Sequence, residues 1–481
     1  PHAVIRPYLL NADEAANAPA GFQMVPAKGK QAEGLQYSLQ ISNLDCTGCG
    51  SCANVCPGKK GAKALEMKLF AENEAEQAGF DYAVKLEPKQ DVIDKFKIKG
   101  SWGIVGNDQI GGGRRFIYLE TVVGGGGYRF GESATAYSSL RLGDWPNENV
   151  GWEESKKLDV GFDISFFRKL NVQFDYFYEN RDGIFLQRES IPQFVGVTNT
   201  PWVNLGKMRN RGIDASVQYD QKVGQVHLSA IGNFTFARNV ILEKDQPDYP
   251  ELYMNRTGQA YNETFGYISD GLYVDETDIR TSPDQSFLGA QRPGDIKYKD
   301  LNLDGVIDEK DQKALGYTGV PEIVYGFGLS ARWKGFDASV FFQGTGNVKI
   351  SRLSTLTAGF TNTPCLTNVY QDVVENHWSV DNPDPKADYP RLSIGTNTNN
   401  SVMSDFWLTD GSYLRLKSAE IGYTFPSKWM KAIHLSSLRV YVSGNNLATF
   451  SSFKLWDPDN MTSSTNYPLT RVVNLGIDIK F

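Results

Sequence analysis

Apolar and polar residues alternate along several stretches of the chain after residue 100. In residues 158–166 every second position is apolar: Leu158, Val160, Phe162, Ile164 and Phe166. Residues 170–178 largely repeat the pattern after a short turn at Arg168-Lys169. Because successive side chains of a strand point to opposite faces, this alternation predicts a β-hairpin with one apolar and one polar face.

The same alternation recurs to the end of the sequence. It predicts further strands within residues 213–219, 226–236, 325–333, 336–342, 438–442 and 473–481. Some are joined by short turns, such as Lys334-Gly335, whereas residues 242–320 and 350–405 are expected to form long polar loops. A soluble β-sandwich would also alternate. Aromatic residues near the strand ends, with Asp, Asn, Gln and Ser on the opposite face, favour a barrel that crosses a membrane.

Composition narrows these alternatives. The chain has 481 residues and a formal net charge of −7, without a basic block that would indicate a nucleic-acid partner. No apolar run approaches the roughly 18 residues of a transmembrane helix, whereas the short alternating strands of a barrel remain compatible with the sequence. No charged and then apolar leader follows Pro1, so no signal peptide is predicted within this chain.

Four of the five cysteines form a compact motif before residue 57. They follow the spacing C-x₂-C-x₂-C-x₃-C-P and are Cys46, Cys49, Cys52 and Cys56. Thiolates at this spacing can hold a [4Fe–4S] cluster. Zinc would more often use paired CxxC or His ligands, and the nearest imidazole is His2. The alternative interpretation is that these four cysteines are purely structural. The fifth cysteine, Cys365, lies more than 300 residues after the motif.

An acidic segment matches the calcium loop of an EF-hand. Positions 1, 3, 5, 7, 9 and 12 of that loop are filled by Asp300, Asn302, Asp304, Val306, Asp308 and Asp311. Gly305 occupies position 6, where the chain turns sharply. The sequence therefore predicts a Ca²⁺ or Mg²⁺ site, with Asp311 reaching less far than the usual Glu. A solvated acidic turn is the alternative.

Five motifs in the second part of the chain resemble, in the same order, segments of SusC/RagA-like TonB-dependent outer-membrane transporters. They are GSWGIVGNDQ at 100–109, NRGID at 210–214, GDIKYKDLNLDG at 294–305, YLRLK at 413–417, and the GNNL and DP segments at 444–447 and 457–458. The terminal Phe481 is similar to the last residue of proteins inserted by the barrel-assembly machinery.

The resemblance implies that residues 98–481 are the C-terminal part of such a transporter. It implies a mainly β fold, a partial antiparallel transmembrane barrel in the outer membrane, and uptake of oligosaccharides or peptides rather than enzymatic activity. Its implied partners are membrane lipid, a SusD-like lipoprotein lid and TonB, with no nucleic acid. The family's plug and first strands have no counterpart here, so we expect an incomplete barrel that does not transport alone.

Residues 1–97 resemble the ferredoxin-type domain of pyruvate:ferredoxin (flavodoxin) oxidoreductases. The matching segments are IRPY at 5–8, NLDC at 43–46 and KALEM at 63–67. The resemblance implies a small α+β iron–sulfur segment of cytoplasmic type, and electron transfer is the alternative function. It lacks the parent enzyme's catalytic residues, so no oxidation of pyruvate is expected.

The cluster ligands of the first segment are expected to be incomplete. In two-cluster ferredoxins the fourth Cys of each motif binds the other cluster. The segment starting at Pro1-His2 resembles the tail of a second motif, so Cys46, Cys49 and Cys52 should face one cluster and lack its fourth ligand. Cys56 should point away, at the start of a short helix.

The two segments meet near residues 95–101. Both families have a Lys-Gly-Ser sequence there, and this chain has Lys99-Gly100-Ser101. We therefore expect a chimera joined at this short identity, by sequence assembly or by recombination.

Overall fold

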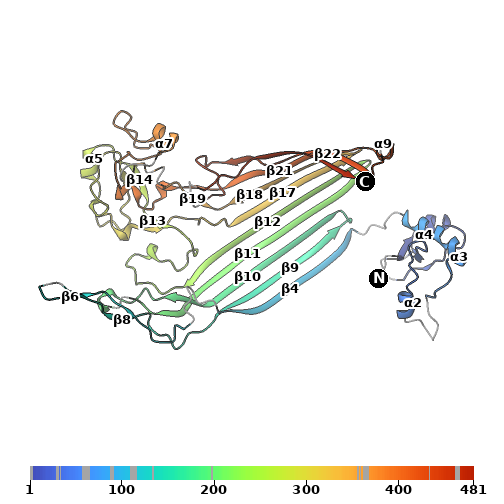
Figure 1. Ribbon diagram of the computed structural model, residues 1–481, viewed down its shortest axis with the longest axis horizontal. Helices are drawn as coiled ribbons and strands as arrows, with labels where there is room; N and C mark the ends of the chain where they lie inside the picture. Colours follow the sequence, from blue (N-terminus) through green and yellow to red (C-terminus); the bar gives the residue numbers. More distant parts are fainter. Residues whose placement is uncertain are drawn as a thin grey trace. The chain divides into compact units, whose positions relative to one another are not determined.

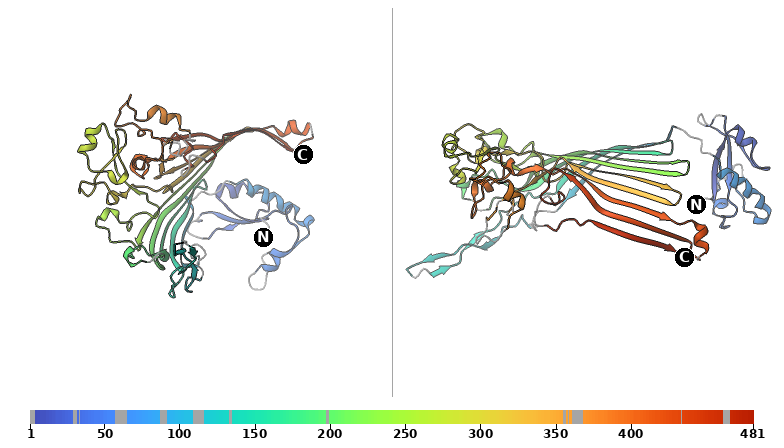
Figure 2. Two further views of the ribbon diagram at one scale, coloured as in Figure 1. Left: turned by 60° about the vertical axis from the view of Figure 1, so that its left-hand side comes forward. Right: turned by 90° about the horizontal axis from the view of Figure 1, so that it is seen from above.

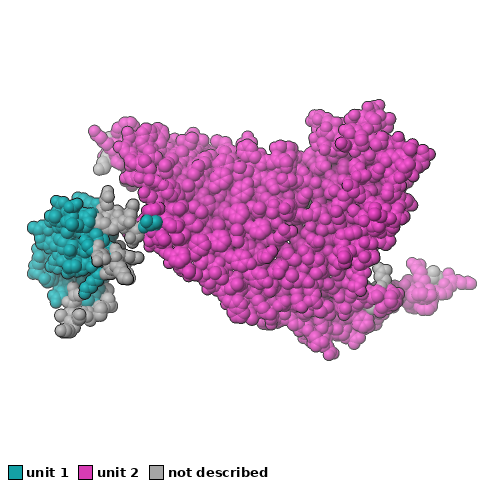
Figure 3. Space-filling model, turned by 180° about the vertical axis from the view of Figure 1, so that it is seen from behind, with its two compact units in different colours: residues 1–92 teal, residues 93–481 magenta. Residues whose placement is uncertain are grey.

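The computed structural model describes residues 4–28, 32, 34–56, 65–86, 92–108, 116–132, 135–196, 199–354, 357, 359–360, 368–432, 434–460 and 466–481. The chain divides into two compact units, residues 1–92 and 93–481 (Figure 3). Among the helices in these ranges, none has the length and apolar character needed to cross a membrane.

The second unit is built on a ten-stranded antiparallel sheet with the order β23-β22-β21-β18-β17-β12-β11-β10-β9-β4 (Figure 1). The sheet is curved, and β4 and β23 form its two edges (Figure 2). Its strands are β4 (Ile93–Asn107), β9 (Glu153–Phe166), β10 (Leu170–Gln187), β11 (Trp202–Val223), β12 (Val226–Glu243), β17 (Ile323–Trp333), β18 (Phe336–Gly346), β21 (Tyr413–Thr424), β22 (Ser437–Ser451) and β23 (Val472–Lys480).

The predicted hairpins are confirmed. Strands β9 and β10 pair with Phe162 opposite Phe174, and the two rings stack with centroids 5.6 Å apart. Strands β17 and β18 are joined by Lys334 and Gly335, whose φ angles are 46° and 89°. A two-residue turn of this type needs positive φ at both positions, which Gly adopts without steric cost. The Lys-Gly turn therefore sets the register between β17 and β18, the two strands that it joins.

Many apolar side chains stay exposed on one face of the sheet. Leu158, Val160 and Phe162 keep 36–45% of their surface, and Leu329 keeps 59%. A sandwich would bury these side chains beneath a second sheet. The other face carries polar and charged side chains, such as Lys99 and Asp163, whose charged groups lie 2.9 Å apart. The fold is therefore mainly β, with the two-faced sheet expected of a barrel wall.

Two segments between strands form a compact substructure, which we call the loop unit: residues 244–320 and the described residues of 349–410. Its small sheets pair β13 (Phe265–Gly266) with β16 (Lys313–Ala314), β14 (Ser269–Leu272) with β15 (Ile296–Tyr298), and β19 (Lys349–Ser351) with β20 (Leu408–Asp410). Its helices are α5 (Glu276–Thr281), α7 (Gln371–Asn376), α8 (Thr398–Ser401), η5 (Leu252–Met254), η6 (Ser286–Leu288), η7 (Glu309–Asp311) and η8 (Asp405–Trp407).

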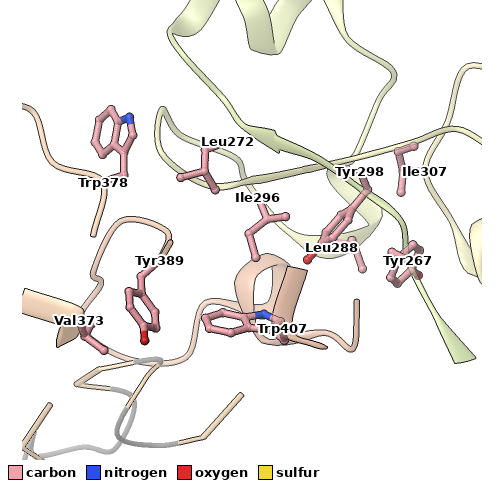
Figure 4. Close-up of a cluster of buried hydrophobic side chains, with 10 residues drawn as sticks. All are labelled: Tyr267, Leu272, Leu288, Ile296, Tyr298, Ile307, Val373, Trp378, Tyr389 and Trp407. Atoms are coloured by element: carbon pink, nitrogen blue, oxygen red, sulfur yellow. The ribbon is translucent and has the colours of Figure 1, made fainter. Parts of the chain in front are cut away.

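The loop unit has its own hydrophobic core, to which both segments contribute (Figure 4). The buried residues are Tyr267, Leu272, Leu288, Ile296, Tyr298, Ile307, Val373, Trp378, Tyr389 and Trp407. The segments expected to be long polar loops therefore also contain a hydrophobic core, to which both contribute side chains.

Shorter elements complete the second unit. They are β5 (Val122–Gly124) paired with β8 (Leu140–Leu142), β6 (Tyr128–Phe130) paired with β7 (Thr135–Tyr137), η4 (Gln193–Val195) and α9 (Ser427–Ala432).

The first unit is a small α+β structure, as expected. Its sheet has the order β1-β3-β2, and Leu10, Phe80 and Ala83 are buried. The elements are β1 (Ile5–Leu10), α1 (Ala12–Ala16), β2 (Val25–Pro26), β3 (Gln36–Ile41), α2 (Ser51–Val55), α3 (Phe70–Asn73), η2 (Glu74–Glu76) and α4 (Gln77–Val84).

The boundary between the units precedes the expected join. Strand β4 begins at Ile93, and Phe96 and Lys97 lie opposite Ile164 and Asp163 of β9. After a register shift between Ile93 and Lys95, residues 95–97 thus continue the pairing of the large sheet. Residues 95–101, where the two families are expected to meet, lie inside one continuous strand.

Candidate functional site

The cysteine motif lies on a tight loop followed by a short helix. Gly48 and Gly50 have φ angles of 68° and 70°, which let the chain reverse within a few residues. Helix α2 starts directly after Gly50, places Cys52 in its first turn, and ends at Val55, with Cys56 as its C-cap. The expectation that Cys56 begins a helix is therefore wrong, because the helix forms earlier, between the third and fourth cysteines.

Cys46 and Cys52 line a cavity of about 470 Å³ within the first unit. Its wall also contains the apolar side chains Ile5, Ile41 and Leu65. Soft thiolates against an apolar wall suit an iron–sulfur cluster. In the part of the chain that the structure describes, however, no three Cys, His, Asp or Glu side chains converge as a metal site. The cavity fits the cluster in its chemistry, but the ligand set is not assembled.

Several residues of the sequence argument lie outside the described ranges. These are Pro1, His2, Pro57, Lys63, Ala64, Gln109 and Cys365.

The first half of the acidic loop is a set of turns closed by its own side chains. The Asp300 carboxylate accepts hydrogen bonds from the backbone N–H groups of Leu303, at 2.6 Å, and Gly305, at 2.7 Å. Asp304 accepts from the Asn302 amide, at 2.9 Å, and from the N–H of Val306, at 3.0 Å. The carboxylates are thus turned toward N–H donors instead of a common point.

In the second half of this loop, a lysine side chain pairs with the carboxylates. The Lys310 ammonium lies 3.2 Å from Asp308 and 3.6 Å from Asp304. Asp311 is completely buried and accepts backbone N–H bonds from Leu301, at 2.7 Å, and Asp308, at 2.9 Å. Burial raises the pKa of the Asp311 carboxyl.

The structure therefore gives no support to the predicted Ca²⁺ or Mg²⁺ site. Among the described residues, no three His, Cys, Asp or Glu side chains come together as a metal site, and this includes the predicted ligands. Those ligands are Asp300, Asn302, Asp304, Val306, Asp308 and Asp311. The physical reason is that backbone N–H groups and Lys310 already take up the oxygen atoms that the spacing assigned to a cation.

Two cavities hollow the polar face of the large sheet. One, of about 460 Å³, is lined by hydroxyl and amide groups, including those of Asn171, Gln173 and Ser216. The other, of about 690 Å³, lies near the hairpin turns and contains Arg332 and Arg439. Alternation predicted this polar face, but not which side chains would gather there, because neighbours across strands depend on register.

The loop unit contains a buried charge that sequence reasoning missed. Asp295 has no exposed surface, and the Arg391 Nε atom lies 2.8 Å from its carboxylate. Asn397 and Asn400 each donate to the same carboxylate at 2.9 Å. Asp295 falls within the motif at 294–305, but its partners follow about a hundred residues later. No local signal linked them.

Comparison with known proteins divides the chain in the same way. Residues 123–447 match the family described as TonB dependent receptor-like, beta-barrel. Residues 39–59 match a 4Fe-4S binding domain.

Relatives of the longer part are named TonB-dependent receptors. TonB-dependent receptor P3 of Formosa agariphila is 28% identical over 421 residues, covering 81% of this chain and 40% of the relative. TonB-dependent receptor SusC of Bacteroides thetaiotaomicron is 24% identical and covers 81% of this chain and 38% of the relative. This chain thus spans about two fifths of the length of these relatives.

The first segment has different relatives. Pyruvate-flavodoxin oxidoreductase of Enterobacter agglomerans is 48% identical over 101 residues, which are 21% of this chain and 8% of the enzyme. The chain therefore combines parts related to two unconnected families.

Solved structures agree on the fold of the longer part. The RagAB peptide importer in its open-open state superposes with a TM-score of 0.60 at 19% sequence identity. The match covers 81% of this chain and 40% of the solved one. At this identity the likeness establishes the shared fold.

Proposed function

This chain belongs to the TonB-dependent receptor-like β-barrel family, and from that premise we propose that its function is uptake of oligosaccharides or peptides across the outer membrane. The observation that carries the proposal is the exposed apolar face of the ten-stranded sheet, with polar cavities on the other face. Lipid would cover the first face, and a water-filled passage would run along the second.

The strands have the dimensions that this role needs. A tilted transmembrane strand needs about 9–11 residues, and β17 and β18 have 11 residues each while β10 has 18. The sheet has two open edges among the described residues. We therefore assign to this chain the C-terminal part of a barrel wall, which needs further strands before it transports.

The loop unit is the surface that we assign to a partner. It lies at the opposite end of the strands from the Lys334-Gly335 turn (Figure 1). The similarity to SusC and to the RagAB importer supports a lipoprotein lid of SusD type at this end and TonB at the other. The same relatives support a transport role rather than an enzymatic one for residues 98–481.

A second function is favoured by the first unit. We propose that residues 1–97 derive from an electron-transfer segment in which Cys46, Cys49 and Cys52 would bind one [4Fe–4S] cluster and Cys56 would be the cross-ligand of a second cluster. The cavity beside Cys46 and Cys52, and the identity to the oxidoreductase, support this proposal. When bound, the cluster would supply one-electron transfer. The thiols and the apolar wall would hold it and exclude water.

For the loop at 300–311 we retain cation binding as a proposal that rests on spacing alone. Binding would require Asp304 and Asp308 to release Lys310, so the K310M variant should bind Ca²⁺ more tightly than the parent chain. Isothermal titration with Ca²⁺ tests this directly. Equal heats for K310M and the parent would mean that the segment is only an acidic turn.

The transport proposal is tested by grafting. Residues 98–481 replace the corresponding part of a full-length SusC relative, and growth is measured on oligosaccharides and on peptides as the sole nutrient. We expect an outer-membrane protein with heat-modifiable gel mobility that restores growth on one of the two classes. A graft that inserts correctly but supports neither would contradict the assigned function, whereas a soluble graft would contradict the barrel.

A further inference from the structure

The apolar row of strand β11 gives way to arginine toward the loop unit. At every second position on the apolar face, the strand carries Tyr219, Val217, Ala215, Ile213, Arg211 and Arg209. Arg211 is eight residues from Tyr219, or about 26 Å along a strand that rises about 3.3 Å per residue. A tilt of about 40° reduces this to about 20 Å, close to the apolar band of a barrel, which is about 25 Å tall. In a bilayer, Arg211 and Arg209 would therefore lie where the hydrocarbon ends.

The register of the sheet brings a third arginine to the same place. Arg211 lies directly opposite Arg238 of β12 on one side and Tyr178 of β10 on the other. Like charges that face each other across two strands destabilise a sheet. Glu322 takes up part of this charge, because it lies 3.3 Å from the Nε atom of Arg238. We call Arg209, Arg211 and Arg238 the arginine patch.

The rest of the patch has no counter-charge. Among the residues that the structure describes, neither Arg209 nor Arg211 forms an ion pair, and the buried Nε atom of Arg209 has no hydrogen-bond partner. The next carboxylates along this face are already paired, Asp182 with Lys156 at 3.2 Å and Glu243 with Lys207 at 2.5 Å. The patch thus keeps a net positive charge between the apolar band and an ion-paired row.

We propose that the arginine patch binds the phosphate group of a membrane lipid. The inference rests on the proposed function, because it needs the apolar face to lie in a bilayer. Phosphate suits the patch because a guanidinium is always charged and donates N–H bonds to phosphate oxygens in pairs. One phosphate between Arg211 and Arg238 would also remove the repulsion between these two side chains.

The position of the patch selects a lipid over a soluble anion. Next to the Arg211–Arg238 pair, toward the hairpin turns, Ile213 and Phe236 lie opposite each other on the apolar face. Tyr178, beside Arg211, is the residue type that barrels place at the boundary between lipid and water. A lipid satisfies both parts of this surface, because its headgroup and its acyl chains are covalently joined.

The test measures lipid binding by the full chain, refolded in a zwitterionic detergent, with native mass spectrometry. The probes are diphosphorylated lipid A, the same lipid after removal of its phosphates, and inorganic phosphate. We expect lipid A to bind and the dephosphorylated lipid to bind more weakly. R209Q/R211Q should weaken the binding of lipid A roughly 30-fold, the effect of two basic residues at a membrane surface.

Two further variants separate the patch from charge and from folding. R129Q/R141Q removes two arginines from β6 and β8, in the hairpins that extend away from the large sheet (Figure 1), and should leave lipid binding unchanged. R209K/R211K keeps the charge and should restore most of the binding that R209Q/R211Q loses. Heat-modifiable gel mobility checks that each variant is folded.

Several outcomes overturn the proposal. Equal binding of lipid A and its dephosphorylated form would mean that only the acyl chains are recognised. Displacement of lipid A by millimolar inorganic phosphate would assign the patch to a soluble anion. An equal loss in R209Q/R211Q and R129Q/R141Q would show an effect of net charge alone. If the chain needs detergent and shows heat-modifiable mobility but does not prefer lipid A, the phosphate site fails while the membrane assignment stands; a chain that is soluble without detergent would contradict the proposed function itself.

Discussion

The Arg391 Nε atom lies 2.8 Å from the carboxylate of Asp295, which has no exposed surface. The two residues belong to different segments of the loop unit, before and after the hairpin of β17 and β18. A buried charge of this kind is tolerated only when it is paired and hydrogen-bonded. The contact therefore locks two segments that are distant in sequence into one substructure.

Breaking this pair should loosen the loop unit specifically. In R391A the buried Asp295 carboxylate loses its counter-ion, which costs about 3–5 kcal/mol for a buried pair. Hydrogen exchange should report faster opening across residues 266–300 and 370–407, while the large sheet keeps its protection. K299A is the matched control: its partner Asp270 lies 3.6 Å away, both side chains are half exposed, and the loss should be about 0–1 kcal/mol. Equal effects would contradict the locking role.

The loop unit should become more stable as the pH falls from neutral toward about 3.9, the ordinary pKa of Asp. Burial raises the pKa of Asp311, so the folded state takes up a proton before the unfolded chain does and is relieved of a buried charge. Hydrogen exchange corrected for its intrinsic pH dependence measures this gain. D311N should lack it, and an unchanged profile in D311N would show that another group is responsible.

Below the ordinary Asp pKa the trend should reverse. Burial disfavours the charged form of Asp278, but the Lys297 ammonium and the Val274 N–H outweigh it and lower the pKa of Asp278. A lowered folded pKa contributes stability that is present above the unfolded value and is lost as the pH falls through the folded value. D278N should therefore show a smaller acid-induced loss of protection than the parent chain; a loss of the same size would exclude this pair as the cause.

Neighbouring residues on opposite faces of β17 should differ sharply in their tolerance to charge. Leu329 lies on the apolar face, and L329R should destabilise the protein in a bilayer by about 2–4 kcal/mol if it lies near the midplane. Ser330 lies on the polar face, so S330R should change the unfolding free energy little. Denaturant unfolding in lipid vesicles measures both, and comparable losses would mean that lipid does not cover the apolar face.

Iron binding by the first unit should depend unequally on its cysteines. Cys46 and Cys52 line the cavity beside the motif, while Cys56 caps the end of helix α2. After anaerobic reconstitution we expect fewer than four irons per chain. C46A and C52A should each lower the iron content further, whereas C56A should retain most of it. Four irons per chain, or a complete loss in C56A, would contradict this ligand assignment.

The sequence was most informative where the structure is local and periodic. The alternation through residues 158–166 and the Lys334-Gly335 turn predicted the hairpins, because strand faces and tight turns depend on adjacent residues. It was least informative where partners are distant, as for Tyr298, whose hydroxyl donates to the Asn399 carbonyl at 2.8 Å. The spacing of the acidic loop predicted its turns, but could not show that Lys310 and backbone N–H groups take the oxygen atoms.

A spin-label scan of residues 158–166 in lipid vesicles tests the central assignment most directly. Each position carries a nitroxide in turn, in a background whose native cysteines are replaced by serine, and collisions with oxygen and with a polar nickel complex are compared. The account predicts a period of two, with oxygen favoured at Leu158, Val160, Phe162, Ile164 and Phe166 and nickel favoured at the positions between them. A scan without this alternation, or with the apolar positions shielded from both reagents, would contradict a sheet that presents this face to lipid.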